Sequence, residues 1–273
     1  MKTFQVTLAL FFLAQFTPGW AVAQEFIFAV NEGVTYRITP AETRERYQKL
    51  GELLSKALGR PVKVVPVEHY PTLRKGLESK AYDLAYVHPA HHSYRAIRDQ
   101  GYRLLALTKG YTGYKVRFLI GKDAPLKLPQ EIRGRTMVMP DPDSITAWIA
   151  RATLRDLGMD PEREQLGTTR YQDGIRFMME NGLCEVGITA ASAVVKDWQA
   201  KGGKVLFESR PVPIKHVIVS PGVPKEDAQR IRSVFLGLES SRDGQAILAT
   251  IGFKGFAAPN EQQTVELTLW LGI

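Results

Sequence analysis

The chain has 273 residues, a formal net charge of +8 at pH 7 and one cysteine, Cys184. A single cysteine excludes an intrachain disulfide, so the fold must rely on packing, and we expect Cys184 to be a buried structural thiol. The net charge indicates either a solvated basic surface or an electrostatic field that attracts anionic ligands. The basic residues are spread along the chain rather than clustered, which disfavours nucleic acid as a partner.

The N-terminal segment has the composition of a secretory signal peptide. Lys2 precedes a short apolar run, and the small residues Ala21 and Ala23 form an A-x-A cleavage site. The run is shorter than the roughly 20 residues that span a bilayer. We therefore expect residues 1–23 to be removed, leaving an exported, soluble chain of 250 residues (273 − 23) that begins at Gln24; an uncleaved N-terminal anchor is the alternative.

The rest of the sequence alternates short apolar runs, which predict strands, with longer amphipathic runs, which predict helices. In the first half we expect strands at 26–30, 62–67, 83–87, 102–108 and 114–122, and helices at 41–58, 71–80 and 89–99. In the second half we expect strands at 136–139, 184–189, 204–209 and 215–220, helices at 144–158, 173–182 and 190–203, and two helices within 224–252. This alternation predicts an α/β fold with parallel sheets, in two lobes that the chain crosses twice, at 114–122 and 215–220.

The residues that follow each strand are the candidates for a ligand site, because open α/β sheets bind ligands beyond the carboxyl ends of their strands. Four such stretches, "EHYPT", "HPAHH", "DPDSIT" and "TAAS", each open a helix. A helix N-terminus offers unpaired N–H groups and about half a positive charge. Several such ends facing one cleft would form an anion site without a cationic side chain.

The strongest candidate is "DPDSIT". The Ser144 and Thr146 hydroxyls and the backbone N–H groups around Ile145 could donate to a tetrahedral oxyanion. The alternative is that Asp143 or Ser144 only caps the helix. In "EHYPT", the Tyr70 phenol could donate to the same anion, or the stretch could be an ordinary helix start.

The stretch "VHPAHHSY" contains three histidines. His88 with His91 or His92 would share a helix face as a metal-ligand pair, but there is no H-E-x-x-H pattern and no evident third ligand. The alternative is a polar first turn, in which His88 faces the cleft. Because the chain has no G-x-S-x-G elbow at Ser192 and no glycine-rich nucleotide motif, we expect neither an enzyme nor a cofactor.

Nearly the whole exported chain resembles the phosphate/phosphite/phosphonate ABC-transporter substrate-binding proteins, a branch of the type II periplasmic binding proteins. The resemblance is carried by "YDLAYVHPAHHSY", "DPDSITAWIARATLRDLGMDPE", "DGIRFMMENGLCEVGITAAS" and "KHVIVSPGVPKEDAQRIRSVFLGLESSRDGQAILATIGFKGF". It implies a two-lobed fold, each lobe a mostly parallel sheet flanked by helices, with two crossover strands. Lobe 1 would comprise residues 24–117 and 216–273, lobe 2 would comprise 118–215, and the lobes would close by a hinge near 116–121 and 213–218.

The same resemblance implies a set of binding residues. The family's Ser-Thr-Ser run at the anion site matches Ser144, Ile145 and Thr146, a family tyrosine after the second strand matches Tyr70, and another near the first crossover is similar in position to Tyr114. Ile145 puts an apolar side chain in the middle of that run, so it can offer only its N–H. Three further positions depart from the family. His88 replaces a glycine, Gln172 with Asp173 stands where His-Asp often opens a helix, and Ala190 replaces an acidic residue that in some members holds a substrate amine.

The function implied is that of a periplasmic solute-binding protein. It would capture a small tetrahedral oxyanion without an amino group, of the phosphonate, phosphite or phosphate type, and deliver it as a monomer to an ABC-transporter permease. The alternatives are an oxyanion sensor that signals to a histidine kinase and a His-cluster metal-binding protein. If His88 titrates within the ligand shell, anion affinity would fall as pH rises.

Overall fold

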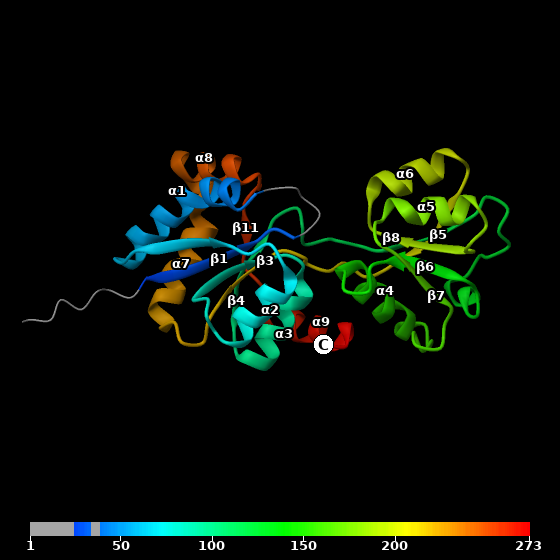
Figure 1. The fold of residues 1–273 in the computed structure, drawn as a ribbon, viewed down its shortest axis with the longest axis horizontal. Coiled ribbons are helices and arrows are strands. Elements are labelled where there is room, and N and C mark those ends of the chain that lie inside the picture. The colour runs from blue at the N-terminus through cyan, green and yellow to red at the C-terminus, as the bar shows by residue number, and fades with distance from the viewer. Residues whose placement is uncertain (1–24, 34–38) are drawn as a thin grey trace, which may run out of the picture.

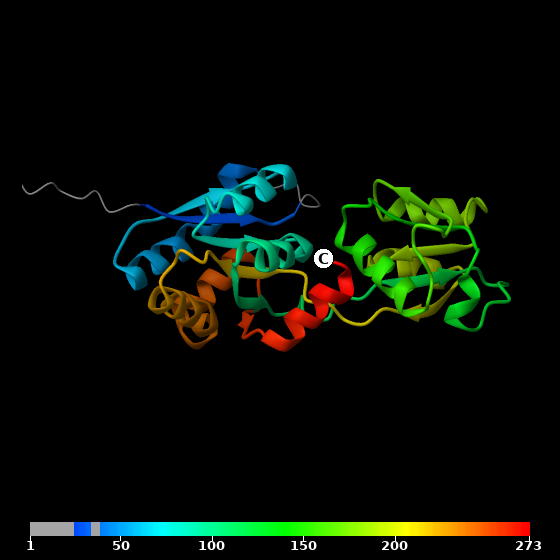
Figure 2. The same ribbon diagram turned by 90° about the horizontal axis from the view of Figure 1, so that it is seen from below.

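The structure, a computed structural model, describes residues 25–33 and 39–273; the expected signal peptide at 1–23 lies outside the described residues. The chain forms two lobes side by side along the long axis of the molecule, each a β-sheet covered by helices (Figures 1 and 2). Within the described residues, no helix is both long and apolar enough to cross a bilayer.

Lobe 1 is built on a six-stranded sheet in the order β11-β4-β10-β3-β1-β2. Its strands are β1 (Phe26–Asn31), β2 (Val62–Pro66), β3 (Leu84–Val87), β4 (Arg103–Thr108), β10 (His216–Val219) and β11 (Phe256–Ala257). β1 pairs in parallel with β2 and β3, and β10 runs antiparallel to both β3 and β4. The strands β1 to β4 therefore share one direction.

Alternate strand residues of lobe 1 face two helical layers, as the period of two in a strand requires. Phe28 and Val30 pack with α1 (Pro40–Leu58), α7 (Lys225–Gly237) and α8 (Arg242–Ile251). Ala29, between them, lies in the opposite core with α2 (Tyr70–Glu78) and α3 (Ala90–Gln100). A short 3-10 turn, η2 (Leu238–Ser240), joins α7 to α8.

Lobe 2 is built on a five-stranded sheet in the order β7-β6-β8-β5-β9. Its strands are β5 (Arg117–Ile120), β6 (Met137–Pro140), β7 (Leu166–Thr169), β8 (Val186–Thr189) and β9 (Lys204–Glu208). β6 pairs in parallel with β7 and β8, and β5 is antiparallel to β8 and β9. Helix α4 (Ile145–Asp156) covers one face, α5 (Asp173–Glu180) and α6 (Ser192–Ala200) cover the other, and a 3-10 turn, η1 (Pro129–Ile132), precedes β6.

The predicted α/β fold with two mostly parallel sheets and two crossover strands is confirmed. The first crossover enters lobe 2 as β5, and the second returns to lobe 1 as β10. Between the sheets, segments 109–116 and 209–215 run side by side, and Tyr114 and Val212 exchange two backbone hydrogen bonds of 3.2 and 2.9 Å. The strand expected at 114–122 is shorter, because its first residues bridge the gap between the two sheets.

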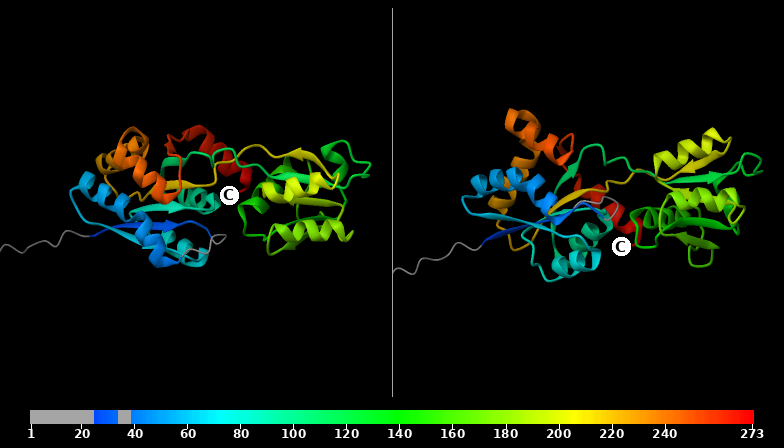
Figure 3. Two further views of the ribbon diagram at one scale, coloured as in Figure 1. Left: turned by 90° about the horizontal axis from the view of Figure 1, so that it is seen from above. Right: turned by 45° about the horizontal axis from the view of Figure 1, so that its top comes forward.

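Helix α9 (Glu261–Leu271) was not predicted from the sequence. It packs against α3 of lobe 1 and α4 of lobe 2, and the C-terminus lies between the lobes (Figure 3). The Arg155 guanidinium on α4 donates to the Trp270 carbonyl at 2.9 Å. Leu269 remains 72% exposed, so the helix lacks the clear apolar stripe that predicts a helix from sequence. The strands β7 and β11, one polar and one only two residues long, were missed for similar reasons.

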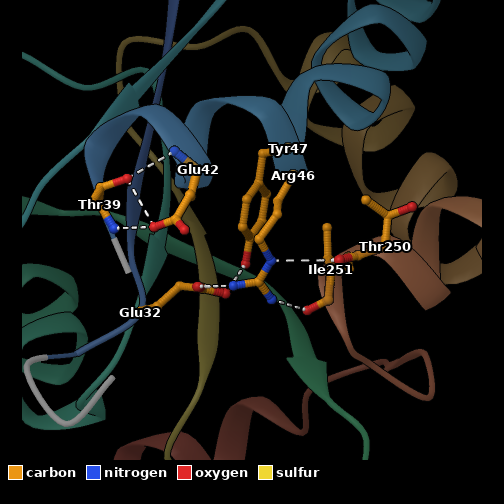
Figure 4. Close-up of polar contacts among 7 residues, drawn as sticks. All are labelled: Glu32, Thr39, Glu42, Arg46, Tyr47, Thr250 and Ile251. Carbon is orange, nitrogen blue, oxygen red and sulfur yellow. Dashed lines mark hydrogen bonds and ion pairs between the residues drawn. The ribbon is translucent and has the colours of Figure 1, made fainter. Parts of the chain in front are cut away.

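The end of β1 is held to the start of α1 by a polar network (Figure 4). Thr39 and Glu42 form a reciprocal capping box at the helix start. One turn further, the Arg46 guanidinium pairs with Glu32 at 2.7 Å and donates to the last carbonyl of α8, and the Tyr47 hydroxyl donates to Glu32 at 2.8 Å. Glu32 directly follows β1, so this network positions the residues at the carboxyl end of that strand.

Candidate functional site

The starts of α2, α3 and α4 lie close together, although α4 belongs to the other lobe. The Tyr70 ring on α2 is 4.9 Å from the His92 ring on α3, measured between centroids. His91 Nε2 on α3 lies 3.5 Å from Asp143 Oδ1, and Asp143 immediately precedes the N-cap of α4, Ser144. Three dipolar helix ends therefore meet in one region instead of facing separate patches of solvent.

The start of α4 places the "DPDSIT" hydroxyls. Ser144 is the N-cap, with φ −81° and ψ 148°, and its Oγ accepts the Ala147 N–H at 3.1 Å. The expected cap is therefore present, but accepting that bond leaves the hydroxyl hydrogen of Ser144 able to donate. Thr146 is 1% exposed, and its Oγ1 lies 2.8 Å from the Tyr114 hydroxyl oxygen. Ile145 is buried, and only its backbone is polar.

The two aspartates that precede α4 have defined partners. Asp141 accepts the Asp143 N–H at 2.8 Å, which closes the turn. The Asp143 carboxylate pairs across the lobes with Arg74 of α2 at 3.0 Å. The neighbouring His91 ring, together with Arg74, lowers the pKa of Asp143 to about 2. The negative charge of Asp143 is thus compensated by lobe 1.

His88 lies between β3 and α3, against the second crossover. Its Nδ1 is 3.0 Å from the Ile214 carbonyl oxygen; since a carbonyl only accepts, Nδ1 carries the proton. Burial lowers the pKa of His88 to about 4, so the ring is neutral at neutral pH and is not expected to titrate between pH 6 and 8, in contrast to the sequence-based hypothesis. Gly33 makes room for the ring, because a Cβ there would lie 2.6 Å from His88 Cδ2.

Gln172 and Asp173 lie at the start of α5. The Gln172 Oε1 accepts from the Thr189 hydroxyl and from the Ala190 and Ala191 N–H groups, at 2.8, 2.8 and 2.9 Å. Asp173 is exposed and accepts the N–H of the next residue. In the described part of the chain, neither side chain hydrogen-bonds to Ser144 or Thr146, so the structure does not join them to the α4 hydroxyls.

Lys215 is a further candidate that sequence reasoning missed. It precedes β10, which pairs antiparallel with β3, so it lies at the same sheet edge as His88. Its side chain is 4% exposed, its Nζ is 3.9 Å from the centroid of the Tyr111 ring, and burial lowers its pKa to about 8. Sequence offered little signal, because Lys215 is one of 36 basic residues; only its place directly before an apolar strand marks it.

Comparison with known proteins gives a family and a fold. The family model described as ABC transporter, phosphonate, periplasmic substrate-binding protein matches residues 33–264. No curated protein matches the sequence.

Solved structures of the same fold include XAC2383 from Xanthomonas citri bound to ATP, with 13% identity, a TM-score of 0.71, and coverage of 91% of this chain and 97% of that one. PhnD1 from Prochlorococcus marinus in complex with methylphosphonate has 14% identity, a TM-score of 0.62, and coverage of 90% and 96%. The aliphatic sulphonate binding protein SsuA from Escherichia coli has 11% identity, a TM-score of 0.55, and coverage of 90% and 85%. At these identities the likeness concerns the fold.

Proposed function

The chain belongs to the family of periplasmic substrate-binding proteins of phosphonate ABC transporters, and from that premise we propose that it binds a small tetrahedral oxyanion at the start of α4. Membership makes it a solute-binding protein that works with a transporter permease, in a family of binding proteins rather than enzymes. The sensor and metal-binding alternatives are not favoured by the match. The observation that carries the proposal is the contact between Thr146 and Tyr114, which pairs hydroxyls from α4 and the first crossover, 2.8 Å apart.

The chemistry of this region suits an oxyanion. The Ser144 and Thr146 hydroxyls and the first N–H groups of α4 are donors grouped at the positive end of a helix dipole. Lys215, at the sheet edge beside His88, adds a positive charge in a region of low dielectric, where its field is weakly screened. An anion would thus be held by hydrogen bonds at α4 and attracted by Lys215.

The anion class follows from the premise and from one departure. PhnD1, which shares the fold, was solved with methylphosphonate, so alkylphosphonates are the first probes. Ala190 follows β8 without a carboxylate, and an amine on the ligand would find no partner at that position. We therefore propose an anion without an amino group, such as methylphosphonate, phosphite or phosphate.

The working cycle would use the two lobes as rigid bodies. We propose that lobe 1 moves with the six-stranded sheet and lobe 2 with the five-stranded sheet, which begins at Arg117, and that bending occurs in the paired segments 109–116 and 209–215 between the sheets. These segments lie at or just before the hinge positions expected from sequence. The protein would be exported by a signal peptide cleaved after Ala23 and would work in the periplasm as a monomer.

The test is a calorimetric titration of the Ser144→Ala, Thr146→Val double variant with methylphosphonate and phosphite. We expect at least about tenfold weaker binding, or about 1.4 kcal/mol. Ser241→Ala is the matched control, because Ser241 caps α8 in the same way, accepting the Gly244 N–H at 3.0 Å. If affinity in the double variant changes by less than about twofold, roughly 0.4 kcal/mol, the α4 site is wrong.

A further inference from the structure

Three potential metal ligands lie together where the two lobes meet. His91 and His92 are in the first turn of α3, and Asp143 precedes α4. Their candidate ligand atoms all lie within 4.8 Å of one another. The sequence suggested His88 with His91 or His92 as a ligand pair and offered no third ligand. The structure instead groups His91 with His92, and the third ligand, Asp143, comes from the other lobe.

The two imidazoles lack hydrogen bonds. His91 is 0% and His92 is 2% exposed, and none of their four ring nitrogens has a hydrogen-bond partner within the described part of the chain. The distance of 3.5 Å from His91 Nε2 to Asp143 Oδ1 is too long for a well-formed bond. Leaving a buried polar group unsatisfied costs about 1–3 kcal/mol, so this arrangement calls for a partner that the protein itself does not supply.

The donor set suits a zinc-like ion. Two imidazole nitrogens and one carboxylate oxygen are ligands of divalent transition metals, at about 2.0–2.2 Å from the ion. A neutral imidazole keeps one ring nitrogen unprotonated, and that nitrogen can bind a metal. Arg74 holds the other oxygen of Asp143, Oδ2, and so orients the carboxylate while Oδ1 faces His91.

The charged residues around the three ligands narrow the choice of ion. Arg74 and Arg95 lie close enough to affect the histidine pKa values. Their positive charges oppose the binding of a metal cation beside them. Ions that rely on charge and oxygen ligands, such as Mg²⁺ and Ca²⁺, are therefore disfavoured relative to ions with strong affinity for imidazole. A small pocket between α2 and α3 is lined by His92, by the basic residues Arg74 and Arg95, and by the acidic residues Glu78 and Asp99.

We propose that His91, His92 and Asp143 bind one divalent transition metal ion, which joins α3 of lobe 1 to the start of α4 in lobe 2. The ion would be an accessory to solute binding and would stabilise the lobe arrangement described here. Because Asp143 is adjacent to Ser144, it would also hold the proposed anion site in place. The metal site can be tested without any anion and does not depend on the proposed function.

The experiment is a calorimetric titration of the chelator-treated chain, purified without a polyhistidine tag, with Zn²⁺, Ni²⁺ and Co²⁺ in phosphate-free buffer. We expect one ion per chain and, with Co²⁺, visible absorption bands from the His-His-Asp coordination. His92→Gln and Asp143→Asn should each weaken binding at least about tenfold. His69→Gln is the matched control, because His69 is an exposed histidine at the start of α2, and it should bind as the wild type does.

Two results would overturn the proposal: no stoichiometric binding to the wild type, or wild-type affinity in Asp143→Asn. If the buried His92→Gln variant does not fold, as judged by circular dichroism without metal, Asp143→Asn decides, since its side chain is 46% exposed and tolerates the change. Methylphosphonate binding, measured with a chelator present, tests the anion site without a metal. It therefore separates failure of the metal proposal from failure of the anion site.

Discussion

Acidification should destabilise the protein because two histidines are buried in their neutral form. His216 on β10 is 0% exposed, with Ser93 Oγ 2.6 Å from its Nδ1 and the edge of the Tyr94 ring packed against it. His92 on α3 is 2% exposed. Desolvation lowers the pKa of each to about 3 from 6.5. The unfolded chain therefore binds two protons at pH 5 that the folded chain excludes.

The size of the effect follows from linkage. Each of these histidines has a pKa of 6.5 in the unfolded chain and of about 3 in the folded chain. Its contribution to the free energy of unfolding is therefore complete above pH 6.5 and is lost progressively as the pH falls from 6.5 toward 3. At pH 5 each loses about 2 kcal/mol, or about 4 kcal/mol together, relative to pH 8. Burial lowers the pKa of His88 to about 4, which adds in the same direction. Asp143, with its pKa lowered to about 2, loses stability only below about pH 4, outside this window.

The assay is urea denaturation at pH 8, 7, 6 and 5 at fixed ionic strength, with a chelator present. The free energy of unfolding should fall by at least about 4 kcal/mol over this range. His216→Leu should reduce this fall by about 2 kcal/mol, whereas His69→Gln, at an exposed position, should leave it unchanged. The reasoning is refuted if the free energies at pH 8 and pH 5 agree within about 1 kcal/mol.

Three more predictions concern single side chains. Lys215→Met should weaken methylphosphonate binding. In the wild type we expect affinity to fall as the pH rises through about 8, where Lys215 loses its proton, and the variant should lack this fall. Both proteins are titrated with the same anion to cancel the anion's own ionisation, and parallel pH profiles would contradict the role of Lys215. Gly33→Ala should destabilise the fold by about 1–3 kcal/mol in urea, because φ is +88° and the new Cβ would strike His88. Gly59→Ala, with φ +67° and no atom within 4 Å, should cost less, and equal losses would show that the His88 contact is unimportant. Gln172→Leu should cost about 1–3 kcal/mol, since it removes the acceptor of the Ala190 N–H and of the Thr189 hydroxyl, while the Ala191 N–H keeps its bond to Thr189 Oγ1; an unchanged unfolding midpoint would count against that role.

Sequence alone determined the features that depend on local pattern. The alternation of apolar runs predicted the α/β fold, and the strand ends identified the stretches that contain Tyr70, His88 and Ser144 as the places where helices begin. It also predicted that Cys184 is a buried thiol, and burial raises the pKa of this cysteine to about 11. These predictions succeed because the spacing of apolar residues and the capping residue at a helix start can both be recognised within about ten neighbouring residues.

Only the tertiary structure decided which of these residues meet. Asp143 reaches Arg74 and His91, which precede it by 69 and 52 residues (143 − 74 and 143 − 91), from the other lobe. Lys215 becomes a buried cation through the pairing of β10 with β3. Helix α9 has no clear stripe because it contacts both lobes at once. In each case the residues that bury or contact the side chain come from segments distant in the chain. The local spacing of apolar residues therefore carries no information about these contacts.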